Sequence, residues 1–130
     1  MRVLVACEHS QRVCKAFRAK GHEAYSCDLV PCTGSKPEWH WQTDALEALR
    51  TRGPWDLVVA FPPCTHLASS GARYWPQKRA DGRQQRAVAF VRALYDCDVP
   101  RVCVENPVGV LSTAWRRPDQ YVQPLSLIHI

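Results

Sequence analysis

The stretch Leu57-Val58-Val59-Ala60-Phe61-Pro62-Pro63-Cys64 decides the fold of this chain. It opens with a short apolar run, and such a run bounded by turn residues predicts a buried strand. The two prolines end that strand, because proline fixes φ and lacks the N–H that a sheet requires. Cys64 therefore follows the carboxyl end of the strand, where open α/β sheets bind their ligands.

A second strand end of the same kind lies further along the chain. The β-branched run Val102-Cys103-Val104 stops at Glu105-Asn106-Pro107. A thiol after one strand and a carboxyl group after the other suit nucleophilic chemistry assisted by an acid. A single cysteine in an apolar chain is more often a small buried residue, so the functional interpretation depends on the order of the two motifs.

The segments around these strands alternate between strand and helix patterns. Apolar runs predict strands at residues 2–6, 22–27, 39–42, 56–60 and 101–105, and helical spacing predicts helices at residues 11–20, 45–51 and 83–95. Ser10 is the expected N-cap of the first helix, and residues 65–82 are expected to form a long loop. The alternation predicts a three-layer α/β domain with a mostly parallel sheet and helices on both faces.

Four motifs of the chain, taken together, resemble those of a known family. They are Val-Ala-Cys-Glu at residues 5–8, Phe-Pro-Pro-Cys-Thr-His-Leu at 61–67, Gly-Ala-Arg-Tyr-Trp at 71–75 and Val-Glu-Asn-Pro at 104–107. In this order they are similar to short phage and prophage DNA cytosine-5 methyltransferases, and the resemblance covers residues 1–124. It implies a Rossmann-like methyltransferase sheet, S-adenosylmethionine as the cofactor and DNA as the partner.

The resemblance also assigns the reacting residues. Cys64 corresponds to the nucleophile, whose thiolate adds to carbon-6 of cytosine and so activates carbon-5. Glu105 corresponds to the proton donor near ring nitrogen 3, a role for which burial must keep its carboxyl group protonated. Asn106 and Arg73 are the expected substrate-binding residues. The target base has to leave the DNA stack to reach such a site.

The same resemblance implies a set of cofactor-binding residues, namely Glu8, Ser10, Asp28, Asp44 and Pro62. Asp28, at the end of a strand, resembles the acid that binds ribose hydroxyls in such folds. Asp44 resembles the one that binds the adenine amine, but Asp44 and Glu47 also have capping-box spacing, so helix capping stays an alternative. Glu8 and Ser10 face the methionine part in this interpretation. The turn they belong to lacks the Gly-x-Gly of many cofactor sites.

The charge distribution favours a nucleic-acid partner. The chain has 17 Lys and Arg against 12 Asp and Glu, a formal net charge of +5. Basic residues gather after Cys64, with aromatic residues among them: Arg73, Tyr74, Trp75, Lys78, Arg79, Arg83 and Arg86. Basic side chains bind phosphates, and aromatic faces stack on bases. A solvated start of a helix is the alternative interpretation.

The composition argues against several other classes. Seven cysteines occur, but an odd number without a secretory leader argues against a disulfide framework. No Cys-x-x-Cys occurs and no histidine has zinc-finger spacing, so no metal site is expected. No stretch approaches the roughly 18 apolar residues of a membrane span. A cytoplasmic protein without membrane or metal partners is the resulting expectation.

Two other functions fit part of the pattern. An amino-methyltransferase has Asp or Asn before its Pro-Pro and an aromatic residue after it, and Phe61 and Cys64 supply neither. A non-catalytic or degenerate domain that binds nucleic acid or cofactor stays open as the alternative. Residues 125–130 match the translation of a mosaic-end adapter from sequencing libraries. We therefore expect a non-native tail there and a methyltransferase core, residues 1–124, that lacks its last two strands.

Overall fold

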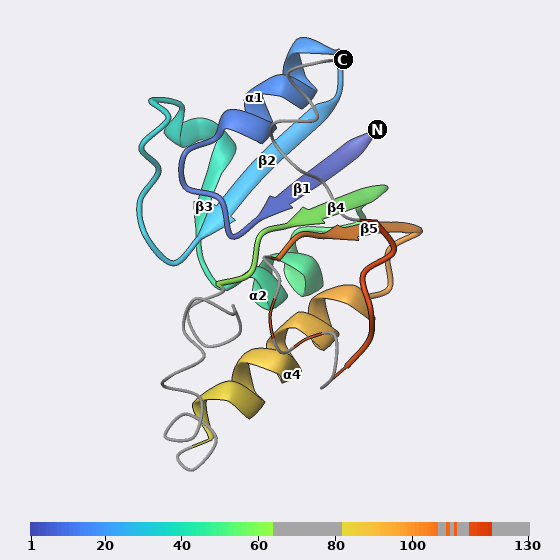
Figure 1. Ribbon diagram of the computed structural model, residues 1–130. Helices are drawn as coiled ribbons and strands as arrows, with labels where there is room; N and C mark the ends of the chain where they lie inside the picture. Colours follow the sequence, from blue (N-terminus) through green and yellow to red (C-terminus); the bar gives the residue numbers. More distant parts are fainter. Residues whose placement is uncertain (64–81, 107–108, 110, 112–114, 121–130) are drawn as a thin grey trace, which may run out of the picture.

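The computed structural model describes residues 1–63, 82–106, 109, 111 and 115–120. Within them, five strands form one sheet in the order β3-β2-β1-β4-β5, and every neighbouring pair is parallel (Figure 1). The strands are β1 (Arg2–Ala6), β2 (Glu23–Asp28), β3 (His40–Gln42), β4 (Leu57–Ala60) and β5 (Arg101–Val104). The helices are α1 (Arg12–Ala19), α2 (Ala45–Thr51) and α4 (Arg83–Tyr95), with a short 3-10 helix η1 (Pro37–Trp39). This architecture confirms the expected α/β, Rossmann-like class.

The order of the strands creates a switch point in the middle of the sheet. The chain builds β1, β2 and β3 toward one edge, then crosses back and adds β4 and β5 on the other side of β1. β1 and β4 are therefore neighbours, with Ala6 paired to Ala60 at their carboxyl ends. Open sheets of this kind bind ligands in the crevice outside those ends.

Helices cover both faces of the sheet, which gives three layers (Figure 1). On one face, Cys14 of α1 forms an apolar cluster with Val3 and Val5 of β1. Leu4 and Ala6, the alternate residues of β1, belong to a second cluster that includes residues of α2 and α4. All four of these β1 residues have 0% of their area exposed. Such a pattern is typical of a central strand that is buried on both sides.

The start of α1 corrects the sequence prediction. Ser10 is not its N-cap, because Gln11 holds that position in the left-handed conformation, with φ 62°. The carboxylate of Glu8 explains the difference. It accepts the N–H groups of Val13 and Cys14, in the first turn of the helix, which a capping side chain would otherwise accept.

The other elements agree with the prediction to within about one residue at each end. The helices expected at residues 45–51 and 83–95 span those residues. At α2, Asp44 is the N-cap but its side chain makes no capping hydrogen bond, so the capping box expected with Glu47 is not formed. Residues 64–81, which hold most of the expected long loop, and the tail at 125–130 lie outside the described residues. In the part of the chain that the structure describes, no helix is long and apolar enough to cross a membrane.

Candidate functional site

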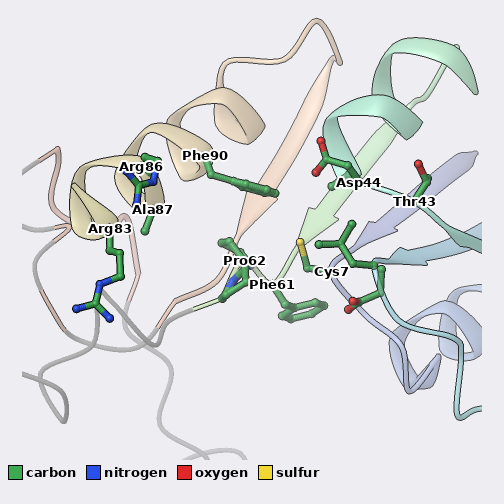
Figure 2. Close-up of a pocket in the computed structure, with 13 residues that line it drawn as sticks. Cys7, Thr43, Asp44, Phe61, Pro62, Arg83, Arg86, Ala87 and Phe90 are labelled. Atoms are coloured by element: carbon green, nitrogen blue, oxygen red, sulfur yellow. The ribbon is translucent and has the colours of Figure 1, made fainter. Parts of the chain in front are cut away.

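A cavity of about 690 Å³ lies at the switch point, outside the carboxyl ends of β1 and β4 (Figure 2). Cys7, which follows β1, and Phe61 and Pro62, which follow β4, line its middle. Residues that end or follow β2 and β3 line one side, and the first turns of α4 line the other. A volume of this size suits a small organic ligand, for which pockets of roughly 300–1,000 Å³ are typical.

The first side of the cavity carries two carboxyl groups. Asp28 ends β2 and accepts a hydrogen bond from the N–H of Val30 at 3.2 Å. Asp44 stands before α2, is exposed and makes no capping bond, so helix capping does not account for its carboxylate. Both aspartates line the cavity. Carboxylates in this position accept hydrogen bonds from the hydroxyl or amino groups of a ligand.

The pKa of the Cys7 thiol responds to its surroundings on this side of the cavity. Burial, and after it the neighbouring Cys27, Asp28 and Asp44, raise the pKa of the Cys7 thiol to about 12. Cys7 is therefore a neutral thiol at physiological pH and is a poor candidate for a nucleophile. The carboxylates that oppose its ionisation favour a ligand that carries positive charge at this place.

The opposite side of the cavity is basic and apolar. Arg83, Arg86 and Phe90 of α4 line it, and their spacing puts them on one face of the helix. Figure 2 shows these side chains across the cavity from Asp44. Guanidinium groups bind phosphate oxygens in a bidentate manner. The cavity thus has an acidic side and a side that suits phosphates.

The turn between β1 and α1 is closed by a carboxylate of its own. Glu8 is buried, and its two carboxylate oxygens accept the N–H groups of Val13 and Cys14 at 3.1 and 3.2 Å. In dinucleotide-binding sheets this helix N-terminus holds a pyrophosphate. Because an internal carboxylate repels a phosphate, the turn suits a ligand that has none.

The motifs that follow β4 and β5 are in contact. The backbone N–H of Glu105 donates to the carbonyl of Ala60 at 3.0 Å. The side-chain amide of Asn106 donates to the carbonyl of Pro62 at 3.1 Å. The Oδ1 atom of Asn106 is buried, and no residue that the structure describes donates a hydrogen bond to it. A buried acceptor without a partner is costly, so this atom is suited to a donor group of a ligand.

The structure brings together most of the site residues expected from the sequence. Asp28, Asp44 and Pro62 line the cavity. Glu8 and Ser10 line a second, smaller hollow of about 310 Å³. Cys7, which follows β1, and Phe61, which follows β4, line both this hollow and the cavity. These five residues therefore surround one region at the carboxyl end of the sheet.

The other expected residues need separate comment. Glu105 is exposed and is not among the described residues that line the cavity, so the burial that its acid role requires is missing in this structure. Cys64 and Arg73 lie outside the described residues. The sequence reasoning missed Phe90, although its helical spacing from Arg83 was a signal that could have found it.

Neither metal ligands nor known relatives add to this site. Among the residues that the structure describes, no group of three or more His, Cys, Asp or Glu is placed to hold a metal ion. In comparisons with known proteins, no family model, no curated protein and no solved structure matches the chain. The function must therefore be argued from the two-sided cavity and from the contact between the two motifs.

Proposed function

We propose that this chain is a catalytic domain for S-adenosylmethionine-dependent methylation of cytosine carbon-5 in DNA, with Cys64 as the nucleophile. The hydrogen bond from Asn106 to Pro62 carries the proposal, because it ties the segment that leads to Cys64 to the segment that holds Glu105. Pro62 itself lines the two-sided cavity. A cofactor rich in amino and hydroxyl groups suits the acidic side, and a substrate that bears phosphates suits the basic side.

The acidic side fits S-adenosylmethionine by the chemistry of its residues. Asp28 suits the ribose hydroxyls and Asp44 the adenine amine, since a carboxylate accepts the hydrogen bonds that these groups donate. Burial is the main cause of the raised pKa of Cys7, but the carboxylates of Asp28 and Asp44 contribute to it, and their negative charge favours a sulfonium group. The carboxylate of Glu8 at the N-terminus of α1 disfavours a dinucleotide. When bound, this cofactor supplies the methyl group that carbon-5 receives and leaves as a neutral thioether.

Cys64 supplies the covalent step in this proposal. Its thiolate adds to carbon-6 of cytosine, and the electron pair of the 5,6 double bond is drawn toward ring nitrogen 3. A proton from Glu105 neutralises the charge that develops at nitrogen 3. After carbon-5 has been methylated, it loses its own proton, the thiolate is expelled, and the proton on nitrogen 3 returns to Glu105. The net change replaces the carbon-5 hydrogen with a methyl group and releases one proton.

Glu105 and Asn106 complete the side that receives the base. Because Glu105 is exposed in the structure, the incoming base must bury its carboxyl group before the proton transfer. Asn106 is the substrate-binding residue beside it in this proposal. Its Oδ1 atom is buried and Asn106 does not line the cavity, so this segment has to open before the exocyclic amine of cytosine can donate to it. Arg83 and Arg86 suit the phosphates on either side of a base that has been turned out of the stack.

Covalent capture tests the proposal. In DNA that contains 5-fluorocytosine, fluorine replaces the carbon-5 hydrogen, so the final elimination fails and the protein stays linked to the base. With S-adenosylmethionine present, we expect an adduct that resists denaturation. The adduct should be lost in Cys64→Ser and kept in Cys103→Ser, since Cys103 is exposed and does not line the cavity. A chain that binds DNA but forms no adduct contradicts the proposal and supports the non-catalytic binding domain.

A further inference from the structure

Gln11 occupies an unusual place at the end of the turn between β1 and α1. Its backbone is left-handed, with φ 62° and ψ 15°, a conformation that residues with a side chain disfavour. Its side chain is fully buried and makes no capping hydrogen bond to α1. A buried polar group needs partners, so the role of Gln11 depends on what its amide contacts.

The amide of Gln11 binds the main chain of one distant residue. Its Nε2 atom donates to the carbonyl of Lys36 at 2.7 Å, and its Oε1 atom accepts the N–H of Lys36 at 3.1 Å. Nε2 also donates to the hydroxyl oxygen of Ser26, a buried residue of β2, at 3.3 Å. Through these bonds Gln11 joins the start of α1, the sheet and the connection between β2 and β3.

Residues 29–36 of that connection, the β2–β3 loop, fold back over the turn that precedes α1. The N–H of Thr33 donates to the carbonyl of His9 at 2.8 Å, and the ammonium group of Lys15 donates to the carbonyl of Gly34. Gly34 lies so close to the turn that an added Cβ atom would come within 2.5 Å of the carbonyl oxygen of Ser10. The loop and the turn therefore form one packed unit.

The β2–β3 loop begins at the acidic side of the cavity. Asp28 directly precedes it, and both Asp28 and Leu29 line the cavity. Leu29 has 71% of its area exposed, so burial of its side chain does not hold this end in place. Its carbonyl accepts a hydrogen bond from Gln42 at 3.3 Å. The far end of the same loop is the end that Gln11 holds.

We propose that Gln11 is a positioning residue that holds the β2–β3 loop against the turn and so fixes Leu29, the cavity residue at which the loop begins, before the cofactor arrives. The inference rests on the proposed function in one respect, namely that Leu29 contacts the cofactor. A wall that is already ordered binds its ligand without the entropy cost of ordering a loop. Loss of the Gln11 bonds therefore lowers cofactor affinity although no residue of the cavity is changed.

Gln11→Met is the test variant, because methionine has nearly the length of glutamine and forms neither hydrogen bond to Lys36. Lys36→Ala is the matched control, since Gln11 binds the main chain of Lys36 and not its side chain. Two quantities are measured: the hydrogen-exchange rate of the amide at residue 36, and the affinity for S-adenosylhomocysteine by calorimetry. For Gln11→Met we expect exchange about tenfold faster and a Kd about tenfold weaker. For Lys36→Ala we expect no change in either.

Each result decides a part of the inference. Unchanged exchange at residue 36 in Gln11→Met overturns the claim that Gln11 holds the loop, and faster exchange with unchanged affinity overturns its positioning role. If the unmodified chain does not bind S-adenosylhomocysteine, the proposed function and the positioning role fall together, while the exchange rate still decides whether Gln11 holds the loop. If Gln11→Met does not fold, Gln11→Gly removes the same bonds and suits the left-handed backbone, and we expect the same two shifts from it.

Discussion

The two halves of the sheet differ in how the segments at their carboxyl ends are held. In β1, residues 3–6 are all buried. After β1, the carboxylate of Glu8 closes the turn onto α1, and the side chain of Gln11 bonds this turn to the connection after β2. In β5, exposed and half-buried residues alternate and none is buried. The segments after β4 and β5 are joined through the amide of Asn106 and the carbonyl of Pro62.

Under the proposed function, this difference implies that the cofactor and the substrate are bound in different ways. The half from β1 to β3 presents Asp28 and Asp44 on a frame that is already bonded together, so the cofactor meets a preorganised surface. In the half from β4 to β5, no described residue donates to Oδ1 of Asn106, and Glu105 is exposed, so the substrate has to complete this half. Variants in the first half should therefore change the affinity for the cofactor, and variants in the second half should change the rate of methyl transfer.

The largest effect is expected at Cys64, which tests whether the second half is catalytic. A serine hydroxyl is a far weaker nucleophile than a thiolate at neutral pH, so Cys64→Ser should lower methyl transfer by roughly 10⁴-fold. The affinity for S-adenosylhomocysteine should not change. Transfer of a radiolabelled methyl group to DNA and calorimetry measure the two quantities. Transfer at the rate of the unmodified chain would show that another group is the nucleophile and would contradict the role proposed for Cys64.

The next effect is expected at Asn106, which joins the two segments of the second half. Asn106→Asp keeps the size of the side chain and an acceptor oxygen but cannot donate to the carbonyl of Pro62. A misplaced reacting group costs about 10²-fold in rate, so methyl transfer should fall by about that factor. Cofactor affinity, which belongs to the first half, should stay the same. Equal losses of rate and affinity would show that the halves are not separable.

A smaller effect tests the raised pKa of Cys7 in the first half. The pKa of Cys7 is raised from 9.0 to about 12, first by burial and then by Cys27, Asp28 and Asp44. A raised pKa leaves a smaller fraction of Cys7 as thiolate, although each thiolate is then more nucleophilic. Alkylation of Cys7 by iodoacetamide should therefore be roughly 30-fold slower than that of the exposed Cys103. Peptide mass spectrometry measures both rates. Similar rates at the two thiols would show that the pKa of Cys7 is not raised, and the support that this shift gives to a cationic ligand would be lost.

The same shift makes stability depend on pH. The folded protein keeps a proton on Cys7 that the unfolded thiol loses above its ordinary pKa of 9.0. The stability that Cys7 contributes is therefore complete below pH 9 and is lost as the pH rises toward about 12. Urea unfolding across this range should show a smaller decline for Cys7→Ser than for the unmodified chain.

Asp44→Asn should weaken binding of S-adenosylhomocysteine by about tenfold, because a hydrogen bond to a charged group contributes roughly 1.5–3 kcal/mol. The rate of methyl transfer at saturating cofactor should hardly change. Asp98→Asn is the control, since Asp98 is exposed and does not line the cavity. Unchanged affinity in Asp44→Asn would mean that the acidic side does not hold the cofactor.

Local sequence patterns were sufficient for the strands but not for the turn before α1. Leu57–Ala60 identified β4 because an apolar run bounded by prolines is a property of neighbouring residues. Asp28 and Asp44 were expected at the site from the family resemblance, and both line the cavity because parallel strands end at the same edge of a sheet. The role of Gln11 was not predictable. Its partner is the main chain of Lys36, and every residue offers the same main-chain groups, so the sequence carries no signal for the pair.

The smallest effect is expected at Glu8, where the structure and the family resemblance disagree about the role. In the structure, Glu8 binds the N–H groups of Val13 and Cys14 at the start of α1. Glu8→Gln keeps one acceptor oxygen, so one N–H loses its partner and the attraction to the helix dipole disappears. The free energy of unfolding, measured in urea, should fall by about 1 kcal/mol.

The second measurement on Glu8→Gln decides between the two roles. If Glu8 stabilises the turn, the affinity for S-adenosylhomocysteine should fall by no more than about threefold, because both carboxylate oxygens already accept hydrogen bonds from backbone N–H groups. If the resemblance is right and Glu8 binds the methionine part, affinity should collapse while stability stays the same. The second outcome would mean that the first half is less preorganised than its hydrogen bonds indicate, because the carboxylate would have to leave α1 to meet the ligand.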